Sequence, residues 1–398
     1  MLFCLNHLEE SGYPMPKYNI AFATDENYLP YTFVVCQSII DSISKQYRDI
    51  SSDDSIIFHI LTDKSVDIAD LQLKANSFQE RNKAIIDNLM VIHNIDVDQF
   101  SFCKGWGIHA SKSTYYRLLL SELLDPSVRE ILYLDVDTLV LKDIRDLFDN
   151  TDLSNHVAAV VLDTIIANAY SDSISNIYGS NDKKQGFPVH FSKYFNAGML
   201  LINLDKWRQD NIGLKCIDLI KVGLPFLDQD ALNIAIPDPL IIDGKWNFQT
   251  TALYAYEYSF VKNRLLSRGA GKDLKEMKNN ILENNILASI DDPSIIHFTA
   301  FKPWQNHVNC SLNNVHYICN NDNFELIKKW QESALKVTEF AGDFNRLKFD
   351  QWINASYCIN QLNLALKKEV KARRKLRKQF FIALIVLFLI QLYISLFY

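Results

Sequence analysis

The sequence predicts an α/β protein whose main domain is a mostly parallel sheet flanked by helices. Short apolar runs recur at residues 18–23, 55–61 and 89–93, and a turn with Asp or Asn closes each run. Segments with apolar residues at helical spacing lie between them. Strands that alternate with helices are typical of a parallel sheet, because each parallel connection needs a long crossover.

Later segments extend this pattern. The apolar runs at 130–134, 157–162 and 198–203 predict further strands, and residues 113–124, which end just before Pro126, predict a helix. Residues 163–194 are polar and only weakly periodic. A structureless stretch of that length is uncommon inside a compact domain, so we expect a lid or a substrate loop there.

Length and composition limit the class of protein. At roughly 150 residues per domain, the 398 residues allow one large α/β domain with appendages or two domains. Hydrophobic residues make up 48% and charged residues 22%, which is too apolar for a disordered chain. The net charge is −6, and an acidic protein argues against nucleic acid as the main partner.

The last 32 residues differ in character from the rest. Residues 367–378 hold eight of the 41 basic residues, and residues 380–398 carry no charge, Gly or Pro. As a helix this apolar segment would reach about 28 Å, close to the thickness of a hydrocarbon core. We expect a basic run plus a membrane-anchoring helix, single-pass or inserted, on the cytoplasmic face of a membrane such as the bacterial inner membrane. The alternative is a buried C-terminal core helix.

Two carboxylates follow the apolar strand at 130–134. Asp135 and Asp137 stand at positions i and i+2, a spacing that directs both to one side. Ligands of open parallel sheets gather at the carboxyl ends of strands. Two carboxylates facing one point repel each other unless a divalent cation bridges them, and such a cation commonly carries a diphosphate. The alternative is a pair of solvated turn aspartates.

Four other segments offer polar groups beside apolar runs. Asp25, Asn27 and Tyr28 follow the first strand, where an amide or carboxylate can bond a base and an aromatic ring can stack on it, or where they form an Asx turn. The remaining segments are Tyr194-Phe195-Asn196-Ala197-Gly198, Asp228-Gln229-Asp230 and His297 with Lys302. For the lone His297, a satisfied core histidine is the alternative.

Together these segments resemble, in order and at similar intervals, the family 8 glycosyltransferases, which include bacterial lipopolysaccharide galactosyl- and glucosyltransferases and, more distantly, glycogenin. The resemblance covers residues 17–304 and implies a retaining sugar transfer from a nucleotide diphosphate sugar on a GT-A fold. It divides the chain into a catalytic domain at 17–304, a C-terminal helical extension at 305–366 and the tail at 367–398. The matching motifs are Ala23-Thr24-Asp25-Glu26-Asn27-Tyr28, Tyr116-Arg117-Leu118, Leu134-Asp135-Val136-Asp137, Phe195-Asn196-Ala197-Gly198, Asp228-Gln229-Asp230 and His297 with Lys302-Pro303-Trp304.

The resemblance also implies roles for individual residues. Two residues depart from the family pattern: Ala300 stands where a Gly is usual, and Lys302 comes one place early. The implied nucleotide contacts are Ala23, Asp25, Asn27, Tyr28 and Val136; the metal ligands are Asp135, Asp137 and His297; Arg117 and Lys302 hold sugar and diphosphate; Asn196 and Asp228 bond sugar hydroxyls; and Gln229 lies beneath the anomeric carbon.

A nitrogen ligand beside two carboxylates suits Mn²⁺ better than Mg²⁺, although Mg²⁺ is also compatible. The expected donor is UDP-galactose or UDP-glucose, and the expected acceptor is a membrane-associated glycan or glycolipid such as a lipopolysaccharide core. The first rival is a metal-dependent nucleotidyltransferase, but such enzymes usually carry a Gly-rich basic loop where this chain has Asp25-Glu26-Asn27-Tyr28. The second rival is a membrane-tethered binding protein without catalysis.

Overall fold

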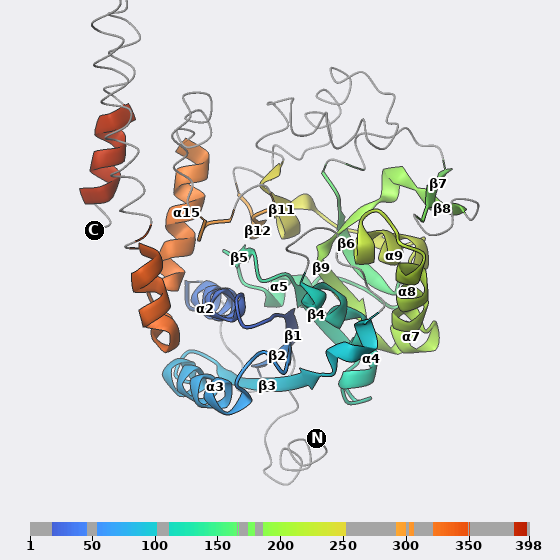
Figure 1. Cartoon of the computed structure of the whole chain (residues 1–398), viewed down its shortest axis with the longest axis horizontal. Helices are drawn as coiled ribbons and strands as arrows, with labels where there is room; N and C mark the ends of the chain where they lie inside the picture. The colour runs from blue at the N-terminus through green and yellow to red at the C-terminus, as the bar shows by residue number, and fades with distance from the viewer. Residues whose placement is uncertain are drawn as a thin grey trace, which may run out of the picture. The chain divides into compact units, whose positions relative to one another are not determined.

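The computed structural model describes residues 18–45, 54–101, 111–164, 166, 174–179, 186–251, 292–299, 302–305, 321–348, 350 and 386–395 (Figure 1). The chain divides into two compact units, residues 1–300 and 301–398.

A sheet of seven described strands forms the centre of the first unit, in the order β10-β6-β9-β4-β1-β2-β3. Neighbouring strands run parallel except β9, which is antiparallel to both β4 and β6. The mostly parallel sheet is therefore confirmed. Its strands are β1 (Tyr18–Ala23), β2 (Ser55–Asp63), β3 (Asp87–Ile95), β4 (Glu130–Leu134), β6 (Ala158–Leu162), β9 (Phe195–Asn203) and β10 (Leu240–Ile241).

Helices cover both faces of this sheet because its strands are apolar on both sides. On one face, α2 (Leu29–Lys45) and α3 (Ile68–Asn82) bring Phe33 and Phe78 together at 5.6 Å, and Phe78 also packs on Phe58 of β2. On the other face, sheet residues such as Ala21 and Tyr133 share one buried cluster with several other helices. Those are η1 (Val97–Phe100), η2 (Lys112–Leu119), α4 (Leu120–Leu123), α7 (Leu204–Gln209), α8 (Ile212–Lys221) and α9 (Leu227–Ala235).

Smaller elements complete the first unit. Three short strands form a second sheet in the order β11-β12-β5, and β7 pairs antiparallel with β8. The hairpin lies within the segment expected to be a lid or substrate loop. The bounds are β5 (Thr138–Val140), α5 (Arg145–Asp149), β7 (Ile174–Tyr178), β8 (Gly186–His190), η3 (Phe191–Lys193), η4 (Gly244–Asn247), β11 (Phe248–Gln249) and β12 (Ile295–His297).

Two sequence-based predictions need correction. The helix expected at 113–124 is a 3₁₀ helix, η2, followed by the four-residue α4. Five consecutive side chains of η2, Tyr115 to Leu119, are all buried, so this segment has no solvent-facing stripe of the kind a surface α-helix shows. The strand expected at 198–203 begins three residues earlier, at Phe195, and it runs against its neighbours. An apolar run looks the same in either direction, so only the connections decide strand orientation.

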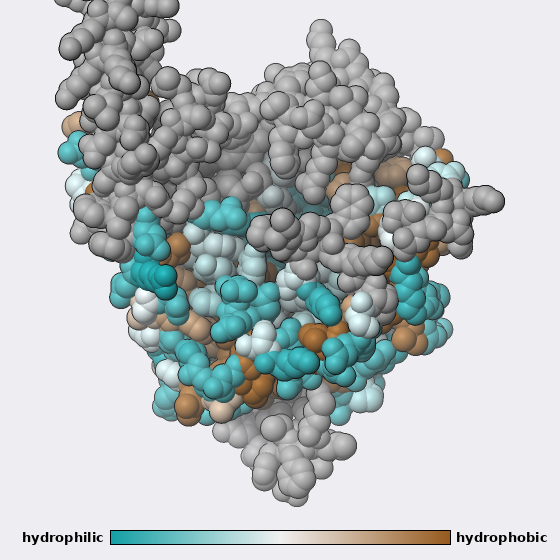
Figure 2. Space-filling view, viewed as in Figure 1, coloured by the Kyte–Doolittle hydropathy of each residue, from teal (hydrophilic) through white to brown (hydrophobic). Residues whose placement is uncertain are grey.

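The described part of the second unit is mainly helical. It contains α15 (Asn321–Ala334), η5 (Thr338–Phe340) and helical residues at 341–348 and 386–395. Trp330 of α15 packs against Trp304 and Phe344. On the face seen in Figure 2, hydrophilic side chains predominate on the described surface of the first unit, with smaller hydrophobic areas between them.

Among the described residues, none of the helices has the length and apolar character needed to cross a membrane. The spanning anchor expected at 380–398 thus gains no support, and only residues 386–395 of it are described. The basic run at 367–378 lies outside the described residues. Tyr393 of the described tail helix donates a hydrogen bond to Gln331 of α15, and Phe388 and Leu389 are more than half exposed.

Candidate active site

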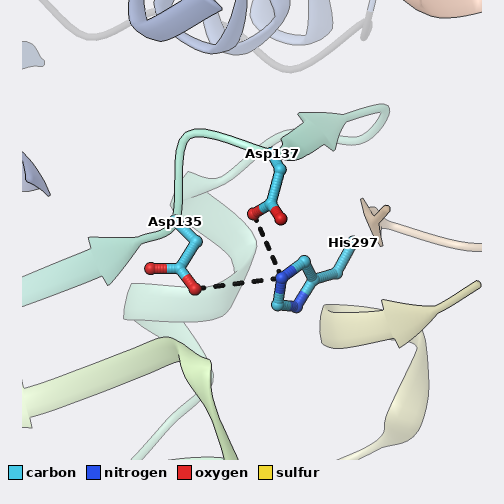
Figure 3. Close-up of side chains that lie close together, drawn as sticks. All are labelled: Asp135, Asp137 and His297. Atoms are coloured by element: carbon cyan, nitrogen blue, oxygen red, sulfur yellow. Dashed lines mark ion pairs between the residues drawn. The ribbon is translucent and has the colours of Figure 1, made fainter. Parts of the chain in front are cut away.

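The two carboxylates lie in the turn between β4 and β5. The hydroxyl of Thr138 donates to the backbone oxygen of Asp135 at 2.8 Å, which closes the turn. β5 pairs antiparallel with β12, and this register sets His297 opposite Thr138. The short second sheet therefore brings His297 to the carboxylates across 160 residues of sequence, as Figure 3 shows.

The side chains of Asp135, Asp137 and His297 converge on one point. The imidazole Nε2 of His297 is 3.1 Å from Oδ1 of Asp137 and 3.9 Å from Oδ2 of Asp135. One ligand atom from each residue lies within 4.8 Å of the others. Two carboxylate oxygens and one imidazole nitrogen at this spacing suit a divalent cation such as Mn²⁺. The donor set thus fits the metal that the sequence predicts.

The second oxygen of Asp135 is held by the protein. Its Oδ1 accepts hydrogen bonds from the hydroxyl of Tyr133 at 2.9 Å and from Nη2 of Arg117 at 2.8 Å. This leaves Oδ2 facing His297. Arg117 is buried, its guanidinium stacks 4.3 Å from the centre of the Tyr133 ring, and its Nε lies 3.2 Å from Oδ2 of Asp228. Arg117 therefore orients both carboxylates.

Burial shapes the charge of this cluster. Desolvation raises the pKa of the Asp228 carboxyl, and the Arg117 guanidinium opposes that shift. Burial also raises the pKa of the Tyr133 phenol well above its usual value, so the phenol stays protonated and can donate to Asp135. Thr114 of η2 donates a further hydrogen bond to Asp228 at 3.1 Å.

Gly198 of β9 allows the close approach of these side chains. A Cβ atom at this position would lie 2.1 Å from Cε1 of His297 and 2.9 Å from Oδ2 of Asp135. The backbone oxygen of Gly198 also accepts from the amide of Asp135 at 2.8 Å. Only a residue without a side chain fits here, which explains the Gly that the sequence places before the apolar run.

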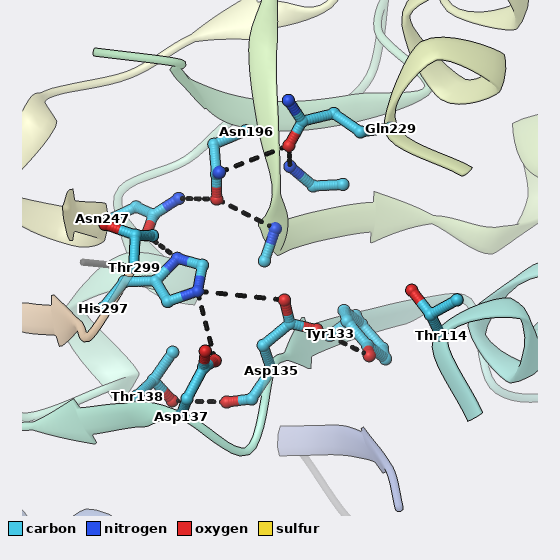
Figure 4. A network of polar contacts seen from close by, with 12 residues as sticks. Thr114, Tyr133, Asp135, Asp137, Thr138, Asn196, Gln229, Asn247, His297 and Thr299 are labelled. Carbon is cyan, nitrogen blue, oxygen red and sulfur yellow. Dashed lines mark hydrogen bonds and ion pairs between the residues drawn. The ribbon is translucent and has the colours of Figure 1, made fainter. Parts of the chain in front are cut away.

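Amide side chains form the next layer of the site (Figure 4). Oε1 of Gln229 accepts from the amide of Ala197 at 3.1 Å and from Nδ2 of Asn196 at 3.3 Å. Nε2 of Gln229 donates to Oδ2 of Asp163 at 3.2 Å. Asp163 directly follows β6, and sequence reasoning missed it. The available signal was the one used for Asp135, an acidic residue at the end of an apolar strand.

The predicted nucleotide contacts follow β1, a neighbour of β4 in the sheet. Oδ1 of Asp25 accepts from the backbone amides of Asn27 and Tyr28, which is the Asx turn weighed as the alternative. Its Oδ2 accepts from the hydroxyl of Ser111, which connects this turn to η2 at 2.6 Å. Ala23 is the last residue of β1. Their contact with a nucleotide stays a prediction.

The last two predicted contacts, Val136 and Lys302, belong to different units of the chain. Val136 is buried between the two carboxylates in the turn. Lys302 belongs to the second unit, and its contact with a phosphate stays a prediction. Hydrogen bonds and ion pairs join five predicted residues of the first unit into one group: Arg117, Asp135, Asp137, Asp228 and His297. Asn196 and Gln229 form a second, hydrogen-bonded pair.

Solved structures with a similar architecture show the fold type. The structure resembles that of the galactosyltransferase LgtC in complex with donor and acceptor sugar analogues, with a TM-score of 0.53, 22% identity and coverage of 81% of this chain and 99% of that chain. The apo structure of the bifunctional glycosyltransferase WbbM gives a TM-score of 0.51 at 20% identity, covering 78% of this chain and 51% of that one. The fold is of the GT-A type, as the sequence predicts.

The sequence comparison then gives the family. The model of glycosyl transferase family 8 matches residues 19–307, and the chain belongs to this family. It is 30% identical over 208 residues to General stress protein A of Bacillus subtilis, covering 50% of this chain and 61% of the relative. It is 28% identical over 254 residues to the lipopolysaccharide 1,3-galactosyltransferase of Salmonella typhimurium, covering 62% of this chain and 67% of the relative. The chain thus spans about two thirds or less of the length of these relatives.

Proposed function

We propose that this protein is a retaining glycosyltransferase that moves galactose or glucose from a UDP-sugar to a glycan acceptor. The observation that carries the proposal is the convergence of Asp135, Asp137 and His297 at the carboxyl end of β4. In an open α/β sheet this is the edge where a nucleotide binds. A divalent ion held by the three side chains would neutralise the charge that develops on the leaving diphosphate.

The contacts of Gln229 support a front-face mechanism. Its amide oxygen is held by Asn196 and by the backbone of Ala197, and its nitrogen by Asp163. A neutral amide is a poor nucleophile, so a covalent glycosyl intermediate on this residue is unfavourable. The fixed amide dipole can instead stabilise positive charge at an anomeric carbon, while the departing phosphate accepts the proton of the incoming hydroxyl. Such a displacement keeps the anomeric configuration.

Two observations support the proposed acceptor: the name of a relative and the character of the tail. The Salmonella relative is named as acting on lipopolysaccharide. The tail joins eight basic residues to an apolar segment, and Phe388, Leu389 and Leu392 are exposed on its described helix. Exposed apolar side chains near a basic run favour binding to an anionic leaflet. We therefore propose a lipid-linked glycan, such as a lipopolysaccharide core, at the cytoplasmic face of a membrane.

A donor screen tests the proposed activity. UDP-galactose, UDP-glucose and UDP-N-acetylglucosamine are incubated with the protein and Mn²⁺, and UDP release is measured with and without EDTA. We expect metal-dependent UDP release from one of the two hexose donors. Release of pyrophosphate from a nucleoside triphosphate and a sugar phosphate would instead indicate a nucleotidyltransferase. A chain that binds a UDP-sugar without ever releasing UDP would indicate a binding protein.

A further inference from the structure

Asn247, the last residue of η4, contacts His297 on the side away from the carboxylates. Its side chain is buried at 1% exposure and lies between His297 and Asn196 (Figure 4). Its Oδ1 is 3.1 Å from Nδ1 of His297, and its Nδ2 is 3.0 Å from Oδ1 of Asn196. No sequence motif pointed to this residue.

Backbone amides determine which way the side-chain amides point. The amide of Gly198 can only donate, and it lies 3.0 Å from the Asn196 atom that must therefore be the oxygen, Oδ1. The amide of Ala197 likewise requires the oxygen of Gln229 at its contact. The nitrogen of Asn196 then donates to Gln229, which agrees with the 3.3 Å contact between them. Both orientations follow from fixed donors of β9.

These amide orientations also determine which nitrogen of the His297 imidazole carries the proton. The oxygen of Asn196 needs a donor, so Asn247 presents its nitrogen to Asn196 and its oxygen to His297. An oxygen acceptor at 3.1 Å requires the proton of the neutral imidazole to be on Nδ1. Nε2 then carries a lone pair and faces the carboxylates of Asp135 and Asp137.

We infer that Asn247 is a positioning residue that keeps His297 in the Nδ1–H tautomer, so that Nε2 is ready to bind a divalent cation. The inference rests on the proposed metal-dependent function and adds the residue that prepares its nitrogen ligand. Without the oxygen of Asn247, the Nε2–H tautomer would donate to Asp137 Oδ1, 3.1 Å away. That proton would occupy the position where the cation binds. Mutation of a residue that hydrogen-bonds to a metal-ligating histidine commonly lowers metal affinity by about 10- to 100-fold.

The contacts of Asn247 also make a continuous path across the site. Hydrogen bonds lead from His297 through Asn247 and Asn196 to Gln229. Rotation of one side-chain amide by 180° would place donor against donor or acceptor against acceptor at two or more contacts. The backbone of β9 thus determines both the metal-binding nitrogen and the amide that faces the proposed anomeric carbon.

The tautomer can be measured directly on the full chain. Long-range ¹H–¹⁵N correlation spectra of protein labelled with ¹⁵N-histidine distinguish Nδ1–H from Nε2–H, and the His297→Gln variant assigns the signal. We expect Nδ1–H in the metal-free wild type. In Asn247→Leu, which is similar in size and lacks both polar atoms, the Nε2–H form should appear. In Asn247→Asp, which keeps an acceptor, Nδ1–H should persist.

Mn²⁺ titration followed by electron paramagnetic resonance provides the second readout. Asn247→Leu should weaken binding by about 10- to 100-fold. Asn247→Asp keeps the acceptor for His297 but loses the donor to Asn196, so it should recover part of the loss. The control is Asn82→Leu, because Asn82 is a buried asparagine of α3 that bonds to the backbone oxygen of Phe78 and to Gln37. This control should lose stability without losing Mn²⁺ affinity.

Two outcomes would overturn the inference: a neutral His297 imidazole of the wild type that carries its proton on Nε2, or a folded Asn247→Leu variant that binds Mn²⁺ as tightly as the wild type. The wild-type spectrum tests the His297 tautomer even if Asn247→Leu does not fold. A wild type that shows Nδ1–H and yet binds no Mn²⁺ with UDP present would refute the proposed metal-dependent function and not the tautomer assignment.

Discussion

Gly198 and His297 are in such close contact that a single methyl group between them would stand 2.1 Å from the imidazole. The strand β9 therefore forms one wall of the candidate metal site through its backbone alone. The same added methyl group would stand 2.9 Å from Oδ2 of Asp135, so it would crowd two of the three candidate ligands at once.

Replacing this glycine should damage the site. We expect Gly198→Ala to weaken Mn²⁺ binding by about 10-fold or more and to destabilise the protein by about 1–3 kcal/mol, because the added Cβ overpacks a buried contact. Gly342→Ala is the matched control. A Cβ there meets nothing within 4 Å, and alanine in a helix is favoured by about 0.5–1 kcal/mol. Mn²⁺ titration and urea unfolding measure both effects; unchanged Mn²⁺ affinity in Gly198→Ala would contradict the site geometry.

Asp137 should be essential for activity but not for folding. We expect Asp137→Asn to reduce UDP-sugar turnover by about 10²-fold or more, because a neutral carboxamide binds a divalent ion poorly. Circular dichroism and thermal unfolding should stay close to the wild type. Asp210→Asn, an exposed position at the end of α7, is the control and should retain full turnover. Full turnover of the wild type in excess EDTA would show that no metal is needed.

Leu227 adopts a backbone conformation that leucine rarely takes, with φ of 50°, immediately before Asp228 and Gln229. A β-branched side chain is still less compatible with this region. We expect Leu227→Ile to cost about 1–3 kcal/mol of stability and to lower turnover by displacing Gln229. Leu219→Ile is the control, since Leu219 is also partly buried against the same cluster but lies within α8. Equal losses in the two variants would show that the backbone of Leu227 has no special role.

Glu130 should make stability depend on pH. Burial, together with the nearby Asp149, raises its pKa from 4.5 to about 7 in the folded protein. The folded state then binds a proton that the unfolded state has lost, so the unfolding free energy should fall as pH rises from about 4.5 to about 7. Glu130→Gln should reduce this decline in the unfolding free energy by about 1–2 kcal/mol. This is less than the same pKa shift would give for a fully buried carboxyl group, because solvent screens a partly exposed one. Urea unfolding at pH 5 and pH 8 measures it, and the exposed Glu122→Gln should behave as the wild type.

The tail should bind membranes in two separable ways. A chain that ends at Gln379 keeps the basic run and should bind anionic vesicles at low salt and leave them at high salt, since each basic residue contributes about 1 kcal/mol that salt screens. The proposed insertion of the apolar segment predicts that the full chain resists high salt. Flotation assays measure both. A shortened chain that aggregates in gel filtration would instead favour a buried core helix.

Local patterns in the sequence were sufficient for much of this protein. Apolar runs predicted the positions of β1, β2, β3, β4 and β6, because burial on both faces of a sheet requires such runs whatever surrounds them. The acidic pair after β4 was also visible, since a carboxylate at i and i+2 after a strand depends only on neighbours along the chain. Matching several such motifs at once identified the family, which the comparison confirms.

Other features exist only in the tertiary structure, because they depend on contacts between distant segments. The pairing of β5 with β12 brings His297 to Asp135 and Asp137, and no spacing in the sequence encodes that register. The direction of β9 follows from its connections and not from its composition. Asn247 and Asp163 enter the site through hydrogen bonds to His297 and Gln229, which lie 50 and 66 residues away in the sequence. The sequence by itself determined which groups could do the chemistry, and the fold decided which of them meet, since hydrogen bonds and ion pairs act only over a few ångströms.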